Sequence, residues 1–133
     1  MILVDTCVLI DVVEDEPAWS AWSLGQLAQW STLGPVIINP MVFSEWSTLF
    51  PNVGAVESAM RDIQLTWRDT PRQALFLAAK AHAQYRRRGG SKSMVLPDFV
   101  IGAHAAVEGW PVLTRDRRRF ATYFPTLEIV SPD

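Results

Sequence analysis

Residues 1–11 have the sequence Met1-Ile-Leu-Val-Asp-Thr-Cys-Val-Leu-Ile-Asp11, and the rest of the fold can be inferred outward from them. A short apolar run, typical of a buried strand, ends in a carboxylate at Asp5. Thr6 follows and a second apolar run begins, which predicts a strand end, a helix cap and a short helix. Open α/β sheets bind their ligands at the carboxyl ends of their strands, so Asp5 is a candidate site residue.

The remaining chain alternates short apolar or β-branched segments with segments of helical periodicity. Strands are expected at residues 2–4, 36–39, 63–67, 111–114 and 127–130. Helices are expected at residues 6–13, 18–32, 40–49, 53–62, 71–88 and 96–108, with a helical turn at 117–123. This alternation is typical of a single α/β domain, so we expect a central, mainly parallel sheet of about four or five short strands flanked by helices.

The composition is that of a globular domain, since 49% of the 133 residues are hydrophobic and 20% are charged. No apolar run approaches the length of a membrane span, and residues 1–5 lack the basic and long apolar regions of a signal peptide. The single cysteine, Cys7, excludes an internal disulfide. We therefore expect residues 1–133 to form one cytoplasmic domain.

The net charge of −2 conceals a division between the two halves of the chain. Residues 1–60 contain no lysine or arginine, so all 12 basic residues lie in residues 61–133. Most of them fall in two short runs, Arg86 to Lys92 and Arg115 to Arg119. Because such clusters attract phosphates locally whatever the net charge, a polyanionic partner is compatible with this chain.

Three further acids are expected at the same edge of the sheet as Asp5. Glu45 lies in the helix after the second strand, Asp98 in the first turn of a helix, and Asp116 just past a strand. Carboxylates that converge in a cleft repel one another, and a divalent cation removes that penalty. Because oxygen-only ligands favour a hard ion, the pattern predicts a site for Mg²⁺ or Mn²⁺.

Each acid also has an ordinary alternative interpretation. Asp5 and Asp98 are suitable helix caps, and Glu45 is a possible surface charge. Asp116 is a possible turn residue paired with a neighbouring arginine. The joint interpretation is favoured because Asp5, Asp98 and Asp116 all adjoin strongly apolar segments.

Taken together, these features resemble the PIN domain over essentially the whole chain. The resemblance rests on Val4-Asp5-Thr6, on Glu45, on Leu96-Pro97-Asp98 before a small-residue helix, and on Leu113-Thr114-Arg115-Asp116 with Phe120 four residues on. The size and the short first helix resemble the VapC-like toxins of toxin–antitoxin pairs. The resemblance implies that Asp5, Glu45, Asp98 and Asp116 form an acidic metal site, supported by the hydroxyls of Thr6 and Thr114. Cys7 departs from the small polar residue that the family often has at this position.

The function implied by this resemblance is that of a metal-dependent endoribonuclease, in which a metal-activated water attacks an RNA phosphodiester bond. It also implies a cognate antitoxin and, commonly, a homodimer. The expected helix at residues 18–32 is the candidate antitoxin surface, because Trp19, Trp22 and Trp30 with two leucines are too many large apolar residues for one narrow stripe. The alternative is a helix buried on two sides within its own chain.

The arginines around Asp116 are candidate RNA-binding residues, since phosphate contacts supply most nucleic-acid affinity. They are Arg115, Arg117, Arg118 and Arg119. The alternative is a solvated basic turn. The run from Arg86 to Lys92 is explained at least as well by the favourable position of cations at a helix C-terminus.

Other chemistries are less well supported by the residues. His104 is expected about 240° around its helix from Asp98, so we interpret it and His82 as structural rather than catalytic. A haloacid-dehalogenase-like phosphatase needs an acid where Cys7 stands, and a dinucleotide-binding enzyme needs a glycine-rich loop after the first strand. A DNA-directed nuclease and a non-catalytic RNA- or protein-binding PIN domain stay open.

Overall fold

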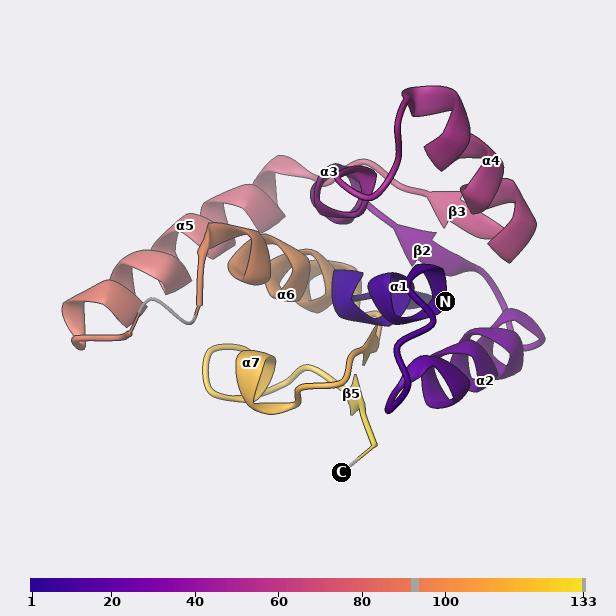
Figure 1. The fold of residues 1–133 in the computed structure, drawn as a ribbon. Coiled ribbons are helices and arrows are strands. Elements are labelled where there is room, and N and C mark those ends of the chain that lie inside the picture. Colours follow the sequence, from indigo (N-terminus) through magenta and orange to yellow (C-terminus); the bar gives the residue numbers. More distant parts are fainter. Residues whose placement is uncertain (92–93, 133) are drawn as a thin grey trace.

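A five-stranded parallel sheet forms the centre of the molecule, which a computed structural model describes at residues 1–91 and 94–132 (Figure 1). The strand order is β3-β2-β1-β4-β5, and every neighbouring pair is parallel. The strands are β1 (Ile2–Val4), β2 (Val36–Ile38), β3 (Leu65–Trp67), β4 (Val112–Leu113) and β5 (Ile129–Val130). The predicted α/β fold with a parallel sheet is therefore confirmed.

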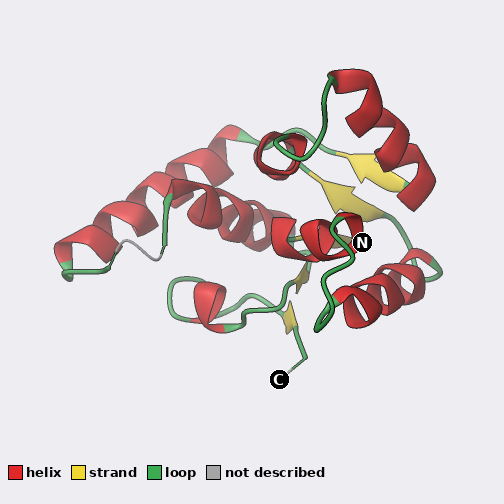
Figure 2. Cartoon of the chain, in the orientation of Figure 1, coloured by secondary structure: helices red, strands yellow, loops and turns green. Residues whose placement is uncertain are grey.

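Helices connect the strands and surround this sheet (Figure 2). They are α1 (Thr6–Val13), α2 (Ser20–Ser31), α3 (Pro40–Ser47), α4 (Val53–Ile63), α5 (Arg72–Arg87), α6 (Leu96–Glu108) and the single turn α7 (Arg118–Ala121). Every expected element is present, and the bounds differ from expectation by a few residues. Figure 1 shows α5 and α6 side by side, extending away from the sheet. In the described part of the chain, no helix combines the length and apolar character that crossing a membrane requires.

The central strands are continuous apolar runs in the sequence because they lie in the core of the molecule. Side chains of β1 and β2 are buried on both faces of the sheet, as in other parallel sheets covered by helices. The strand β3 lies at one edge and is partly exposed, in agreement with the alternating pattern of its sequence. The first acid of the predicted site, Asp5, follows directly after the most central strand.

A close approach between α6 and the C-terminal segment brings α7 beside the predicted site. Gly102 lies in α6, and a Cβ at this position would overlap the aromatic ring of Phe124 and press on Phe120. Phe120 is fully buried, so it anchors the single turn α7 against α6. This packing determines where the arginines on either side of Phe120 can reach.

A buried polar contact ties α3 to α6. The Asn39 side-chain oxygen caps α3 by accepting from the Val42 amide at 2.9 Å, while its nitrogen lies 3.1 Å from His104 Nδ1 in α6. The Thr70 hydroxyl lies 3.4 Å from the same ring nitrogen. Burial lowers the pKa of His104, which favours the neutral imidazole in these contacts. His104 is thus structural, as its helical position predicted.

Candidate active site

Asp5 is the central side chain of the site. It stands at the N-cap position of α1, but its carboxylate makes no capping hydrogen bond. Instead, Oδ2 accepts from Thr114 Oγ1 at 2.8 Å, and only 1% of the residue is exposed. The other oxygen, Oδ1, is buried and has no hydrogen-bond partner among residues 1–91 and 94–132. Burial raises the pKa of Asp5, because desolvation outweighs the opposing effects of Arg119 and of the hydrogen bonds from Thr114 and Cys7.

Asp98 serves as a helix cap and as a site residue at once. Its Oδ2 accepts from the Val95 amide at 3.0 Å, which stabilises the first turn of α6. Its Oδ1 lies 3.6 Å from Arg119 Nη1, on the side of Asp5. The two interpretations of this acid therefore apply to different oxygens of one carboxylate.

Glu45 is held from the neighbouring helix rather than left as a free surface charge. Thr6 Oγ1, in the first turn of α1, donates to Glu45 Oε1 at 2.7 Å. Burial raises the pKa of Glu45, and the nearby charges of Asp5 and Asp98 add to this effect. Asp5 at the start of α1, Glu45 in α3 and Asp98 in the first turn of α6 therefore lie close enough to influence one another electrostatically.

Asp116 is placed by the loop after β4. Its amide donates to Thr114 Oγ1 at 3.1 Å, and its Oδ1 accepts from the Arg118 amide at 3.1 Å. The Thr114 hydroxyl therefore contacts two of the predicted acids. It donates a hydrogen bond to the carboxylate of Asp5 and accepts one from the backbone amide of Asp116. This double role explains why a hydroxyl residue ends the strand.

Cys7 is a residue whose role sequence reasoning missed. Its thiol donates to Asp5 Oδ2 at 3.4 Å and lies 3.8 Å from Thr114 Oγ1. Burial, followed by the charge of Asp5, raises the pKa of Cys7 to about 12, so the sulfur is a neutral donor. The available signal was its position two residues after Asp5, where the first turn of α1 faces the site.

The four arginines predicted to bind RNA have different surroundings. Arg115 Nε lies 2.9 Å from Oδ2 of the buried Asp11, and its guanidinium lies 5.3 Å from the centre of the Trp19 ring. Arg117 and Arg118 are both exposed, but the Arg117 side chain donates to the backbone oxygen of Ile129 at 2.9 Å. In the second basic run, Arg86 to Arg88 are exposed at the end of α5, and Lys92 lies outside the described residues.

Arg119 is the fourth of these arginines, and it points into the acidic site. Its Nη1 lies 3.4 Å from Asp5 Oδ2 and 3.6 Å from Asp98 Oδ1, with 30% of the side chain exposed. Burial opposes the charged guanidinium, but Asp5 and then Asp98 more than compensate and raise the pKa of Arg119. A cation of the chain itself thus lies between two of the acids.

The donor atoms suit a hard divalent cation. The unpartnered, buried Oδ1 of Asp5 is an acceptor in need of a positive partner, and the surrounding acids offer oxygen ligands only. Across residues 1–91 and 94–132, however, no three His, Cys, Asp or Glu side chains close around one point as a metal cage would. Asp5 and Asp98 instead both lie close to Arg119.

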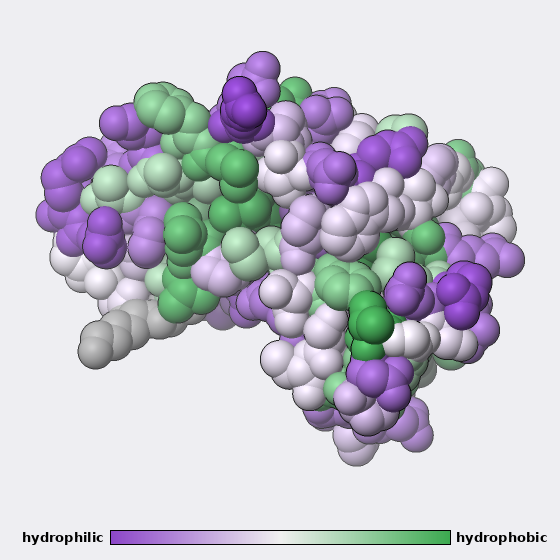
Figure 3. Space-filling model, turned by 90° about the horizontal axis from the view of Figure 1, so that it is seen from above, coloured by the Kyte–Doolittle hydropathy of each residue, from purple (hydrophilic) through white to green (hydrophobic). Residues whose placement is uncertain are grey.

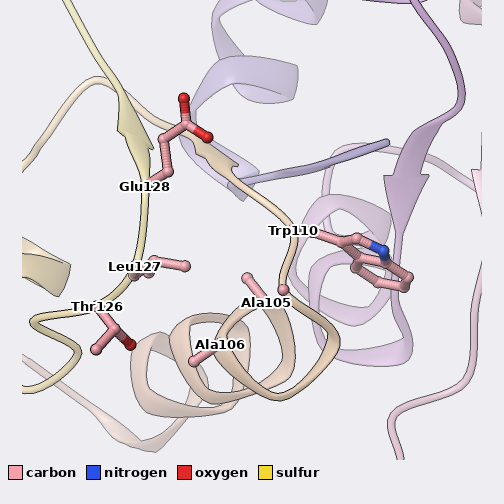
Figure 4. A pocket seen from close by; sticks show the side chains of 7 residues that line it. Ala105, Ala106, Trp110, Thr126, Leu127 and Glu128 are labelled. Atoms are coloured by element: carbon pink, nitrogen blue, oxygen red, sulfur yellow. The ribbon is translucent and has the colours of Figure 1, made fainter.

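A cavity opens next to the acids. It has a volume of about 160 Å³ and is lined by Met94, Asp116, Arg118 and Arg119. A second cavity of about 220 Å³ lies between the end of α6 and the segment before β5 (Figure 4). The second cavity is lined by Ala105, Ala106, Gly109, Trp110, Thr126, Leu127 and Glu128, and includes none of the four acids. Of the four acids, Asp116 is the one that lines the first cavity, together with Arg119, which contacts Asp5 and Asp98.

Comparisons with known proteins agree with this geometry. A family model of the PIN domain matches residues 2–124. The chain resembles the crystal structure of VapBC2 from Rickettsia felis bound to a DNA fragment from its promoter, with a TM-score of 0.74, 16% identity and full coverage of both chains. It also resembles a toxin–antitoxin complex from Klebsiella pneumoniae, with a TM-score of 0.68, 19% identity and coverage of 100% of this chain and 98% of that chain.

A third similar structure is that of FitAcB from Neisseria gonorrhoeae, with a TM-score of 0.66, 18% identity and coverage of 99% of this chain and 98% of that chain. At such low identity these likenesses concern the fold. Comparison with curated protein sequences gave no significant match.

Proposed function

The chain belongs to the PIN domain family, a family of nucleases, and from this we propose that it is a metal-dependent endoribonuclease acting as the toxin of a toxin–antitoxin pair. The observation that carries the proposal is the environment shared by the acids at the carboxyl edge of the sheet. Asp5, Glu45 and Asp98 influence one another electrostatically, and Thr114 links Asp5 to Asp116. Carboxyl groups with perturbed pKa values that lie close to one another are typical of functional sites.

The four acids have distinct parts in this proposal. Asp5 and Asp98, which both lie close to Arg119 Nη1, would hold the cation. Glu45, held by the hydrogen bond from Thr6, would be a further acidic ligand. Asp116 acts from the rim of the cavity. A bound Mg²⁺ or Mn²⁺ supplies an activated water and neutralises charge on the phosphoryl group. Arg118, exposed on the same rim, is the arginine best placed to contact the RNA backbone.

The proposed antitoxin binds at α2. This helix packs on α1 and β2 through the buried Ser23 and Leu27, and its opposite face exposes Leu24. Trp19, Trp22 and Trp30 are half-buried between the two faces, so they belong partly to the core and partly to the surface. The similar structures of toxin–antitoxin complexes support a protein partner for this chain.

The proposed homodimer uses a different surface. Figure 3 shows hydrophobic residues gathered over the half of the molecule that carries α5 and α6. The α5 apolar patch consists of the exposed side chains Leu75, Phe76, Leu77, Val95 and Leu96. Exposed apolar side chains gathered in one region are typical of protein interfaces, and we propose that a second copy of the chain covers part of them.

Cleavage of RNA by the purified protein tests the proposed activity. We expect cleavage of total RNA with Mg²⁺ or Mn²⁺, none with EDTA, and a loss of at least about a hundredfold in Asp98→Asn, which removes a charged ligand. Asp62→Asn, at an exposed position of α4, is the matched control for charge and should cleave normally.

Matched RNA and DNA oligonucleotides in the same assay establish the nucleic-acid class. Cleavage that survives both EDTA and Asp98→Asn would contradict the acidic metal site. Preferential cleavage of DNA would contradict the ribonuclease assignment while leaving the site intact.

A further inference from the structure

Arg119 occupies the position in the acidic site where a positive charge is needed. One nitrogen, Nη1, lies within 4 Å of both Asp5 and Asp98, at 3.4 and 3.6 Å. Asp5 and Asp98 are 93 positions apart in the sequence. Arg119 reaches both of them from α7, which is separate from the helices α1 and α6 that begin close to the two acids. The guanidinium thus performs the neutralising task that a bound divalent cation would perform.

The contacts of Arg119 are those of a cation that can leave. Charge-assisted hydrogen bonds have lengths of about 2.7–2.9 Å, and both of its contacts are longer. Arg115, four residues earlier, offers a contrast within the same segment. Its Nε lies 2.9 Å from Asp11 in an ion pair and its guanidinium lies over the Trp19 ring, so it is held on two sides, although Nε is not aligned for a hydrogen bond.

The surroundings allow the side chain to move while its backbone stays in place. Phe120 is fully buried against α6, which anchors α7. The cavity of about 160 Å³ beside Arg119 offers space for the guanidinium. Asp116 lines that cavity and already favours the charge of Arg119, so it can act as an alternative partner.

We propose that Arg119 is an internal counter-ion that occupies the cation position between Asp5 and Asp98 and must turn out toward Asp116 before a divalent cation binds. The inference rests on the proposed function in so far as that cation is the cofactor of the nuclease. It assigns to Arg119 a regulatory role, because the affinity of the site for metal then includes the cost of displacing the guanidinium. It also explains how the acids remain compatible with a folded chain before metal arrives.

Direct measurement of Mn²⁺ binding tests this role without reference to activity. Free Mn²⁺ is followed by electron paramagnetic resonance during titration of the wild-type chain, Arg119→Gln and Arg118→Gln. The last variant removes the same charge from the adjacent, exposed position. We expect Arg119→Gln to bind Mn²⁺ at least about tenfold more tightly than Arg118→Gln, because only Arg119 competes for the acid oxygens.

Arg119→Lys keeps the charge and provides a second variant should Arg119→Gln fold poorly. A single ammonium cannot reproduce the guanidinium geometry, so we expect an affinity between those of Arg119→Gln and the wild-type chain. Equal affinities for Arg119→Gln and Arg118→Gln would overturn the proposal. So would an absence of Mn²⁺ binding by folded Arg119→Gln, since no cation position would then have been uncovered.

Thermal unfolding in EDTA and in Mn²⁺ gives an independent measure. In EDTA, Arg119→Gln should unfold at a lower temperature than Arg118→Gln, because Asp5 and Asp98 lose their counter-ion. In saturating Mn²⁺ the order should reverse. Failure of the proposed function would look different: a wild-type chain that binds Mn²⁺ and responds to Arg119→Gln as expected, but cleaves no RNA.

Discussion

At the scale of single residues, burial explains why Asp5 differs from an ordinary helix cap. Its carboxylate is enclosed by the sheet edge, and Thr114, Cys7 and Arg119 all direct positive hydrogen atoms toward Oδ2. These contacts favour the charged form, but desolvation is larger and raises the pKa. A residue with this balance stores unfavourable energy when ionised, which a bound cation would relieve.

The raised pKa values of Asp5 and Glu45 predict how stability depends on pH. Their ordinary values are 3.8 and 4.5, and both are higher in the folded protein. The folded state therefore holds protons that the unfolded state has released, and the free energy of unfolding falls as pH rises through the raised values. We expect urea unfolding in EDTA to show this loss as pH rises above the ordinary values of 3.8 and 4.5. Asp5→Asn should flatten the pH profile, because an amide does not titrate.

Two further measurements complete the pH experiment. Asp62→Asn, an exposed acid of α4, should leave the slope unchanged. Added Mg²⁺ should stabilise the wild-type chain more at high pH than at low pH, because it binds the ionised acids. Parallel pH profiles for the wild-type chain and Asp5→Asn would contradict the raised pKa of Asp5.

At the scale of elements, the loop after β4 is fixed on one side to α1 and α2. The buried Asp11 in α1 accepts from Ser23 Oγ in α2 at 2.8 Å and pairs with Arg115. Arg115 in turn lies over Trp19, at the start of α2. The segment that carries Asp116 is therefore positioned by the same helices that form the proposed antitoxin surface.

Substitution of Arg115 and Arg118 should separate a structural arginine from an RNA-binding one. Arg115→Ala should lower the free energy of unfolding by about 3 kcal/mol, because Asp11 would be left buried without its counter-charge. Arg118→Ala should change stability by less than about 0.5 kcal/mol. It should weaken RNA binding and reduce the slope of log affinity against log salt by about one unit.

Chemical denaturation and filter binding at several salt concentrations measure these two effects. If Arg115→Ala were as stable as the wild-type chain, the pairing with Asp11 would not hold the loop. If the slope of log affinity against log salt were unchanged in Arg118→Ala, Arg118 would not contact the RNA.

At the scale of the whole molecule, three surfaces serve three partners in this proposal. The cavity beside the acids receives RNA, α2 receives the antitoxin, and the α5 apolar patch receives a second copy. The division of charge along the sequence is reorganised by folding, since β4 lies next to β1 in the sheet. Acids from the N-terminal half and arginines from the C-terminal half thereby meet at one edge.

The homodimer can be tested on the α5 apolar patch. Phe76→Asp places a charge on a side chain that is 65% exposed, so it should leave the monomer folded and disrupt the dimer. Val53→Asp, on an apolar residue that is 63% exposed on α4, is the matched control and should remain dimeric. Light scattering during size-exclusion chromatography measures the mass. A wild-type monomer, or a dimer unaffected by Phe76→Asp, would contradict this interface.

Sequence reasoning determined the elements and their order, and it predicted an acidic site at the carboxyl edge of the sheet. Periodicity of apolar residues is local, so it predicted each strand and helix to within a few residues, and the parallel topology followed from their alternation. Because parallel strands share one carboxyl edge, the acids that follow them could be expected together before their contacts were known. The geometry of one helix also predicted that His104 faces away from Asp98.

Only the tertiary structure decided which atoms meet. Thr114 and Asp5 are 109 positions apart, and Thr6 and Glu45 are 39 apart, so their hydrogen bonds depend on how β4, β1, α1 and α3 pack. The four arginines near Asp116 look equivalent in sequence, yet Arg115 pairs with Asp11 and Arg119 enters the acidic site. The physical reason is that a side chain's direction on a short turn is set by the buried residues that anchor the turn, here Phe120 against Gly102.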